Sequence, residues 1–99
     1  MIESAAYLKT EHGSKYLVQL CKHFAHKVEV TYSDNHGECR FDRGVATLDA
    51  DADGLRMTVK ADNEEGLDWG QSVIESHLAR FAFREKLGAF DWQRQGEVA

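Results

Sequence analysis

The spacing of apolar residues at the start of the chain predicts a strand followed by a helix. Residues 4–10 have the composition of a short strand. Apolar side chains then recur at positions i, i+1, i+4, i+5 and i+8, on one helical face, which predicts a helix over residues 15–27. These side chains are Tyr16, Leu17, Leu20, Cys21 and Phe24. Ser14 is placed to cap the helix, and Lys27 suits the negative end of its dipole.

Beyond residue 27 the pattern takes the period of a β-strand. Four runs alternate apolar with polar residues, and a turn containing glycine separates each run from the next. The runs are 28–33, 38–42, 46–50 and 55–61, and the turns are 34–37, 43–44 and 51–54. This arrangement predicts an antiparallel meander with one face on the core and the other in water.

A second helix is predicted after the meander. It opens near residues 62–65, where a capping residue precedes acidic side chains. Gly66 and Gly70 weaken its first turns, and the helix is firm from Gln71 to Lys86, with Gly88 as a suitable stop. Its inward face consists of Val73, Ile74, His77, Leu78 and Phe81.

The order of elements is β-α-β-β-β-β-α, which favours an α+β fold of two layers. Two helices are expected on one face of a five-stranded antiparallel sheet. Phe90 and Trp92 are expected to fold back over an edge of the core. Residues 1–92 are thus predicted to form a single domain, and residues 93–99 a frayed C-terminal tail.

Composition narrows the range of functions. Of the 99 residues, 42% are hydrophobic and 29% charged, which is typical of a globular chain. The net charge of −5 argues against nucleic acid as a partner, because clustered Lys and Arg are needed to neutralise phosphates. Apolar runs are too short to span a bilayer, so a membrane is not expected as a partner. The first residues lack the features of a secretory signal, which predicts a cytoplasmic protein with reduced cysteines.

Two segments invite a metal-binding hypothesis. Residues 49–54 open like a calcium-binding loop, but the twelfth position counted from Asp49 is Lys60, a cation, so a hairpin turn is predicted instead. His23 and His26 lie about 60° apart on a helical wheel and can share a transition metal if other ligands join them. Cys21 lies in the apolar stripe, which indicates a core residue. The alternative role of His26 is that of a cation at the helix end.

His77 lies inside the apolar arc of the second predicted helix. A buried imidazole needs a partner, and the structural alternative is a hydrogen bond to a backbone carbonyl or to Tyr7, Tyr16 or Tyr32. The functional alternative is a polar anchor in a cleft between the two helices and the sheet, which His23 is placed to share. Arg80 and Arg84 follow on the same helix and can hold a carboxylate or phosphate, or form surface ion pairs.

Three stretches of the chain resemble a known bacterial family. Residues 16–27, 48–53 and 77–85 are similar to the family called domain of unknown function 2218, and the similarity extends over nearly the whole chain. The resemblance implies a TATA-binding-protein-like topology of the order β-α-β4-α. It implies no established activity, and only a contextual hint of iron or siderophore functions.

Two classes of function stay open after these observations, and catalysis has the least support. The first is a non-catalytic binding module, with a small molecule in the helix–sheet cleft or a protein partner, including a second copy in a homodimer, on the wet face of the sheet. That face is predicted to carry Glu29, Thr31, Arg40, Asp42, Thr47, Arg56, Thr58 and Lys60. The second is a metal-binding protein using His23 and His26, with His77 as a further ligand. No cofactor other than such a metal ion is expected.

Overall fold

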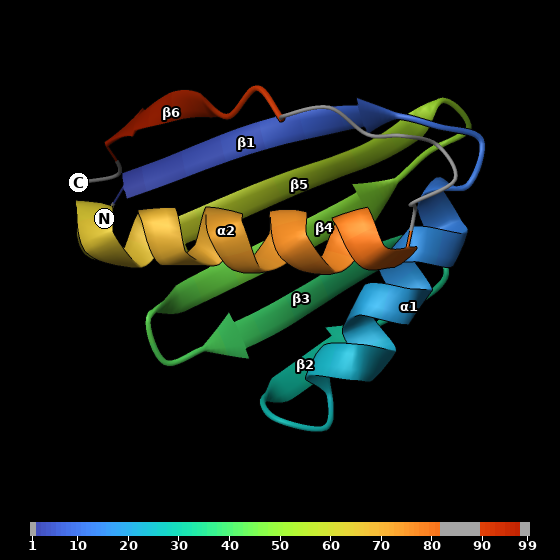
Figure 1. Ribbon diagram of the computed structural model, residues 1–99, viewed down its shortest axis with the longest axis horizontal. Helices are drawn as coiled ribbons and strands as arrows, with labels where there is room; N and C mark the ends of the chain where they lie inside the picture. The colour runs from blue at the N-terminus through green and yellow to red at the C-terminus, as the bar shows by residue number, and fades with distance from the viewer. Residues whose placement is uncertain (1, 82–89, 98–99) are drawn as a thin grey trace.

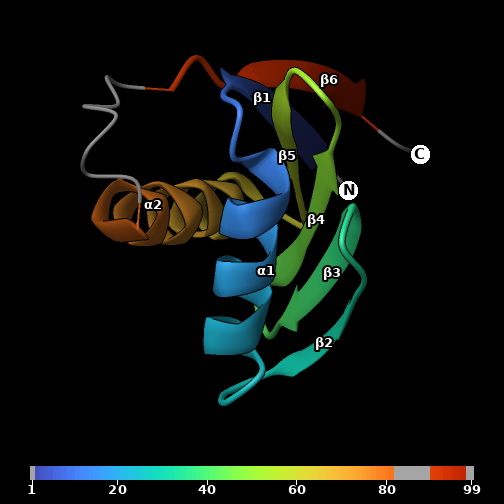
Figure 2. The ribbon, with the colours of Figure 1, turned by 90° about the vertical axis from the view of Figure 1, so that its right-hand side faces the viewer.

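The computed structural model describes residues 2–81 and 90–97. Within these residues, six antiparallel strands form one open sheet, and two helices cover one of its faces (Figure 1, Figure 2). The helices are α1 (Gly13–Phe24) and α2 (Glu64–Phe81). The strands are β1 (Ile2–Lys9), β2 (Glu29–Tyr32), β3 (His36–Phe41), β4 (Gly44–Ala50), β5 (Gly54–Ala61) and β6 (Gln93–Glu97), in the spatial order β2-β3-β4-β5-β1-β6. The α+β class and the placement of both helices are confirmed.

The sixth strand corrects the prediction of five strands and a frayed tail. β6 lies along β1, with Gln93 opposite Ala5 and Arg94 opposite Ser4. Its sequence is wholly polar apart from one glycine, so it has no alternation that would predict a strand. Without β6, β1 would be an edge strand with unpaired backbone groups, and pairing with β6 satisfies them. Backbone hydrogen bonding rather than side-chain burial therefore explains this strand.

The predicted meander is confirmed, and residues 51–54 form a hairpin turn. β2 to β5 pair in sequence order, with Cys39 between Val30 and Ala46, and Leu48 opposite Met57. In the turn, a carboxylate oxygen of Asp51 accepts hydrogen bonds from the backbone N–H groups of residues 53 and 54, both at 2.8 Å. This carboxylate closes the turn as an aspartate commonly does.

Helix α1 begins and ends earlier than the sequence predicts. The predicted cap is wrong, because the hydroxyl of Ser14 donates instead to the carbonyl of Asp34 at 2.6 Å. The first helical residue is Gly13, where a Cβ would lie 2.6 Å from the carbonyl oxygen of Gly54, so only glycine fits this contact. The helix ends at Phe24, and Lys27 lies in the turn that leads to β2.

The two glycines of α2 are explained by close packing rather than by a weak helix. The helix starts at Glu64, with the side-chain oxygen of Asn63 accepting from the N–H of Gly66 at 2.8 Å. A Cβ on Gly66 would lie 2.8 Å from the carbonyl oxygen of Arg43, and one on Gly70 would lie 2.6 Å from Val59 Cγ1. Any larger residue would push α2 away from the sheet. The predicted end at Lys86 and stop at Gly88 lie outside the described residues.

The core lies between the helices and the inner face of the sheet. The predicted apolar stripe of α1 is buried, as are Ile74 and Leu78 of α2. His77 and Val73, which were predicted to face inward, are only partly buried. Phe90 and Trp92 pack against the core, as predicted, and the indole N–H of Trp92 donates to the carboxylate of Glu75.

Candidate functional site

A cleft of about 350 Å³ opens between the end of α1, the turn from β3 to β4 and the middle of α2. Three separate parts of the sequence line it. They are His23, Phe24, Lys27 and Val28 at the end of α1, Phe41, Asp42 and Arg43 at the sheet, and Trp69, Val73 and His77 on α2. Its size falls at the lower end of the range for small-molecule sites, and its lining is mostly apolar with a few polar groups, as in such sites.

Aromatic rings form a continuous chain along this cleft. The ring centroids of His23 and His77 are 4.6 Å apart, and those of His77 and Phe24 are 4.9 Å apart. The chain continues from Phe24 to Phe41 at 5.1 Å and from Phe41 to Trp69 at 5.3 Å. The last three of these pairs meet edge to face, which suits the charge distribution of aromatic rings. The rings hold one another in place across three elements.

The backbone of α2 orients the imidazole of His77. Its Nδ1 lies 2.7 Å from the carbonyl oxygen of Val73, one turn earlier in the helix. Because a carbonyl only accepts, Nδ1 carries the proton, and in the neutral ring Nε2 is then an acceptor. The partner is thus one of those that the sequence predicts, a backbone carbonyl rather than a tyrosine.

Positive charge surrounds His23. Desolvation lowers the pKa of His23 below its ordinary value, and the neighbouring His77, Lys27, His26 and Arg80 lower it further. A neutral imidazole at physiological pH is the consequence. The chemistry of this end of the cleft is therefore that of a neutral ring next to cations.

Arg43 supplies a cation at the other end of the cleft. Its guanidinium carbon lies 5.6 Å from the centroid of the Trp69 ring, a cation–π contact. Arg43 belongs to the two-residue turn that joins β3 to β4, and so does Asp42. Among the described residues, neither Arg43 nor Lys27 forms an ion pair. Two cations are thus available to an anion.

The structure separates the residues that the sequence analysis proposed for a site. His23 of α1 and His77 of α2 meet in the cleft, on the two helices from which the sequence analysis expected them. His26 lies exposed beyond the end of α1 and does not line the cleft, and Arg80 does not line it either. Arg84 lies outside the described residues. Within residues 2–81 and 90–97, no group of three or more His, Cys, Asp or Glu side chains is placed to hold a metal ion.

Apart from His23 and His77, the sequence analysis assigned none of the lining residues to a cleft. It placed Phe41 on the core face of its strand and Arg43 in a turn, and it gave Trp69 no role. Asp42 was predicted on the wet face of the sheet, and this is wrong, since Asp42 lines the cleft from the turn after β3. No sequence spacing links these positions, because sheet and helix packing bring them together.

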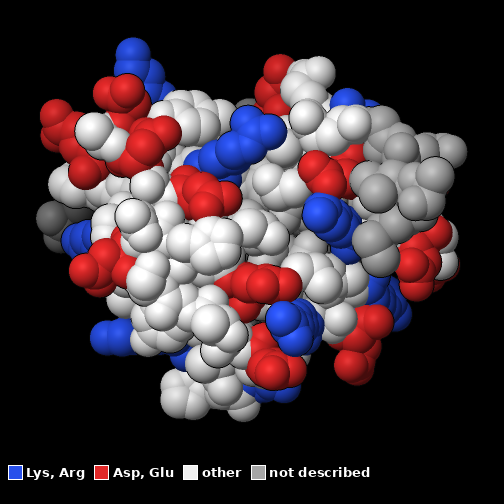
Figure 3. All heavy atoms as spheres, turned by 180° about the vertical axis from the view of Figure 1, so that it is seen from behind, with Lys and Arg blue, Asp and Glu red and all other residues white. Residues whose placement is uncertain are grey.

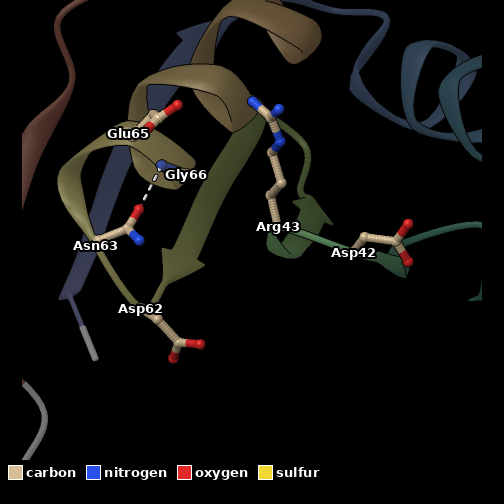
Figure 4. Close-up of a pocket in the computed structure, with 6 residues that line it drawn as sticks. All are labelled: Asp42, Arg43, Asp62, Asn63, Glu65 and Gly66. Atoms are coloured by element: carbon tan, nitrogen blue, oxygen red, sulfur yellow. Dashed lines mark hydrogen bonds between the residues drawn. The ribbon is translucent and has the colours of Figure 1, made fainter.

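A second hollow of about 310 Å³ adjoins the cleft and shares Asp42 and Arg43 with it. Its other lining residues are Asp62, Asn63, Glu65 and Gly66. The side chains of Asp42 and Asp62 start from well-separated positions and do not point toward each other, while Arg43 extends toward α2 (Figure 4). Asn63 is occupied by its hydrogen bond to Gly66. The carboxylates do not converge on a common point, so this hollow offers no assembled polar site.

The outer face of the sheet carries interspersed charges (Figure 3). Arg40 lies 3.9 Å from Glu29 and 3.5 Å from Glu38, and Lys60 lies 3.6 Å from Glu3. His36 and Asp49 are 2.6 Å apart. Opposite charges within and between strands thus neutralise much of this face, which leaves little net charge for a ligand.

Fold and cleft define a small α+β protein with a single antiparallel sheet and a helix-bordered aromatic cleft. The chain belongs to a family of uncharacterized proteins conserved in bacteria (DUF2218), which matches residues 5–93. It is similar to PA4090 from Pseudomonas aeruginosa, whose structure was determined by NMR. The two are 33% identical with a TM-score of 0.80, over 94% of this chain and 96% of that one.

The remaining findings do not extend the assignment beyond the family. No curated protein matches the chain. Neither described helix is long and apolar enough to cross a membrane. The likeness to the TATA-binding protein, the cytoplasmic location and the iron or siderophore context stay predictions.

Proposed function

We propose that this protein is a non-catalytic binding module that takes a small aromatic carboxylic acid into the helix–sheet cleft. The observation that carries the proposal is the combination, in one cavity, of a continuous chain of aromatic rings and two cations without ion-pair partners among the described residues. The proposal rests on this chemistry and not on a family activity.

The rings favour a flat, apolar ligand body. Phe24 is only 3% exposed and forms the floor, while Phe41 and Trp69 are partly exposed at the wall. An aromatic ligand meets such rings edge to face or offset, with a gain of about 0.5–1.5 kcal/mol for each pair beyond the area that it buries. A ligand ring placed between Trp69 and His77 would contact two members of the existing chain of rings.

The charges favour an acidic group on the ligand. Arg43 and Lys27 are positive, and Asp42 is the one acidic residue among the described lining residues. These residues carry a net charge of about +1 when both imidazoles are neutral. The guanidinium can hold a carboxylate with two parallel hydrogen bonds, which is its strongest mode of recognition. The cleft is thus positive although the whole chain carries −5.

Titration with two matched probes tests the proposal. The probes are 2-naphthoate and the uncharged 2-naphthylmethanol, followed by two-dimensional NMR of the labelled protein. We expect naphthoate to shift the signals of Trp69, His23 and His77 in a saturable way, and the alcohol to bind at least about tenfold more weakly, because a charge-assisted hydrogen bond contributes about 1.5–3 kcal/mol. The absence of saturable shifts at these rings with naphthoate would refute the proposal.

Two arginine variants separate specific from general electrostatic effects. Arg43→Gln is expected to weaken naphthoate binding about tenfold while leaving the weak binding of the alcohol unchanged. The matched control is Arg56→Gln, which removes the same charge from the outer face of the sheet, on the exposed side of β5. Equal losses in both variants would show that the anion responds only to the overall charge.

A further inference from the structure

Cys21 and Cys39 form a pair of buried thiols between α1 and β3. Both side chains are fully buried in the core. The two thiols are close enough for each to shift the pKa of the other, although they stand eighteen positions apart in the sequence. They are the two cysteines of the chain, and both are free thiols. A thiol pair in contact can react within one molecule in a way that a single thiol cannot.

The contact at Gly37 shows independently that the sulfur of Cys21 packs against β3. A Cβ added to Gly37 would lie 2.6 Å from Cys21 Sγ. Gly37 and Cys39 are two apart on the same strand, so they share a face of the sheet. The sulfur of Cys21 therefore occupies the space that Gly37 leaves empty, next to Cys39. Helix α1 and strand β3 are therefore in direct contact at Cys21 and Gly37.

We propose that Cys21 and Cys39 are an oxidation site, at which a hydroperoxide converts the two thiols into an intramolecular disulfide. In the first step, the Cys21 thiolate attacks the peroxide oxygen, the O–O bond breaks, and a sulfenic acid and an alkoxide or hydroxide form. In the second step, the Cys39 sulfur attacks the sulfenic sulfur, and the departing hydroxide takes the Cys39 proton as water. Two thiols and one peroxide thus give one disulfide, one water and one alcohol or second water.

The two neighbouring thiols act on each other's acidity. Cys39 lowers the pKa of Cys21, whereas Cys21 and burial raise the pKa of Cys39. Because the thiolate is the nucleophile, the proposal gives the first step to Cys21 and the resolving step to Cys39.

The route of the oxidant passes strand β2. This strand has four residues, lies at the edge of the sheet and is mostly exposed. Its Val30 lies opposite Cys39 and packs against the core beside it. A short edge strand with few buried contacts opens locally more easily than central strands. Such an opening admits a small neutral peroxide to the thiols.

The disulfide would act beside the cleft. Cys21 is one helical turn before Phe24, and Cys39 is two residues before Phe41 on the same face of β3. These two aromatic side chains belong to the floor and wall of the cleft and contact each other at 5.1 Å. The crosslink would therefore join the two elements that carry them. The oxidation site itself does not depend on the proposed ligand.

The test treats the native, fully reduced protein with hydrogen peroxide and follows intact mass and free thiols over time. We expect the loss of two hydrogen atoms and of both free thiols, with the Cys21–Cys39 crosslink identified in a digest without reductant. In Cys39→Ser, a sulfenic acid at Cys21 should accumulate and be trapped by dimedone. Persistence of both thiols, oxidation of each without a crosslink, or disulfides between molecules would overturn the proposal.

Two valine variants test the route and do not depend on replacing a cysteine. Val30→Ala is expected to speed crosslinking severalfold, because it removes two methyl groups from the side chain that lies opposite Cys39 and packs against the core. The matched control is Val45→Ala, which lies opposite Arg40 on the outer face of the sheet and away from the thiols. Equal rates in both variants would overturn the route through β2.

Discussion

The two sides of the sheet carry similar charged residues, but these residues differ in whether they form ion pairs. On the outer face, Arg40 and Lys60 each lie within 4.0 Å of a glutamate. In the cleft on the inner side, Lys27 and Arg43 have no ion-pair partner among residues 2–81 and 90–97, and aromatic rings adjoin them. Exposed ion pairs contribute little to stability and leave little field for a ligand. The comparison teaches that the cleft differs from the outer face by placing cations beside several aromatic rings, which is the basis of the proposed binding site.

The largest change in the free energy of unfolding is expected for Phe24, whose ring belongs to both the cleft and the core. Phe24→Ala should destabilise the protein by about 3–5 kcal/mol, because the ring is buried between α1, β3 and α2 and its removal leaves a cavity. Tyr7→Ala, which removes a ring that is 47% exposed on the outer face, should cost under about 1 kcal/mol. Urea denaturation measures both. Similar losses would show that the two faces do not differ in packing.

A smaller effect is expected from the imidazole that links α2 to the cleft. His77→Ala should lower the free energy of unfolding by about 1–3 kcal/mol, since the bond to the Val73 carbonyl and the contacts with Phe24 are lost. The exposed His26 contacts no aromatic ring within residues 2–81 and 90–97, and His26→Ala should change stability by less than about 0.5 kcal/mol. An unchanged melting temperature of His77→Ala would remove this residue from the packed cleft.

The smallest effect concerns pH. In the folded protein the pKa of His23 is lower than its ordinary value, so the unfolded chain binds the proton more readily. Stability should therefore be fully present above about pH 6.5 and should fall as the pH drops through the folded pKa.

Unfolding curves between pH 5 and 8 measure this effect, with His23→Gln as the comparison. The variant should show a flatter dependence of stability on pH in the acidic part of the range. The same slope in both proteins would assign the pH dependence to other groups.

The candidate site was only partly predictable. His23 and His77 were placed toward a common cleft because each lies on or beside the apolar face of its helix. The metal hypothesis instead paired His23 with His26, on the assumption that the helix continued to residue 27. Since α1 ends at Phe24, the wheel angle between these two histidines does not apply. Where a helix ends depends on the packing of its last turn, which a period does not reveal.

The sequence by itself determined the class of the fold and the side of each main element that faces the core. The 3.6-residue stripes of Tyr16 to Phe24 and of Ile74 to Leu78, and the two-residue alternation of the meander, follow from burying apolar surface. These patterns are local and repeat within each element. They can therefore be recognised from the sequence alone.

Tertiary structure alone decided β6, the two glycines of α2 and the members of the cleft. β6 forms because β1 offers backbone groups to any polar partner, so no side-chain pattern records it. Gly66 and Gly70 are needed because atoms of Arg43 and Val59, which are distant in the sequence, leave no room for a larger side chain. Phe41, Arg43 and Trp69 meet only because a hairpin turn lies under α2. Contacts between distant parts of the chain depend on the packing of whole elements, which local periodicity does not encode.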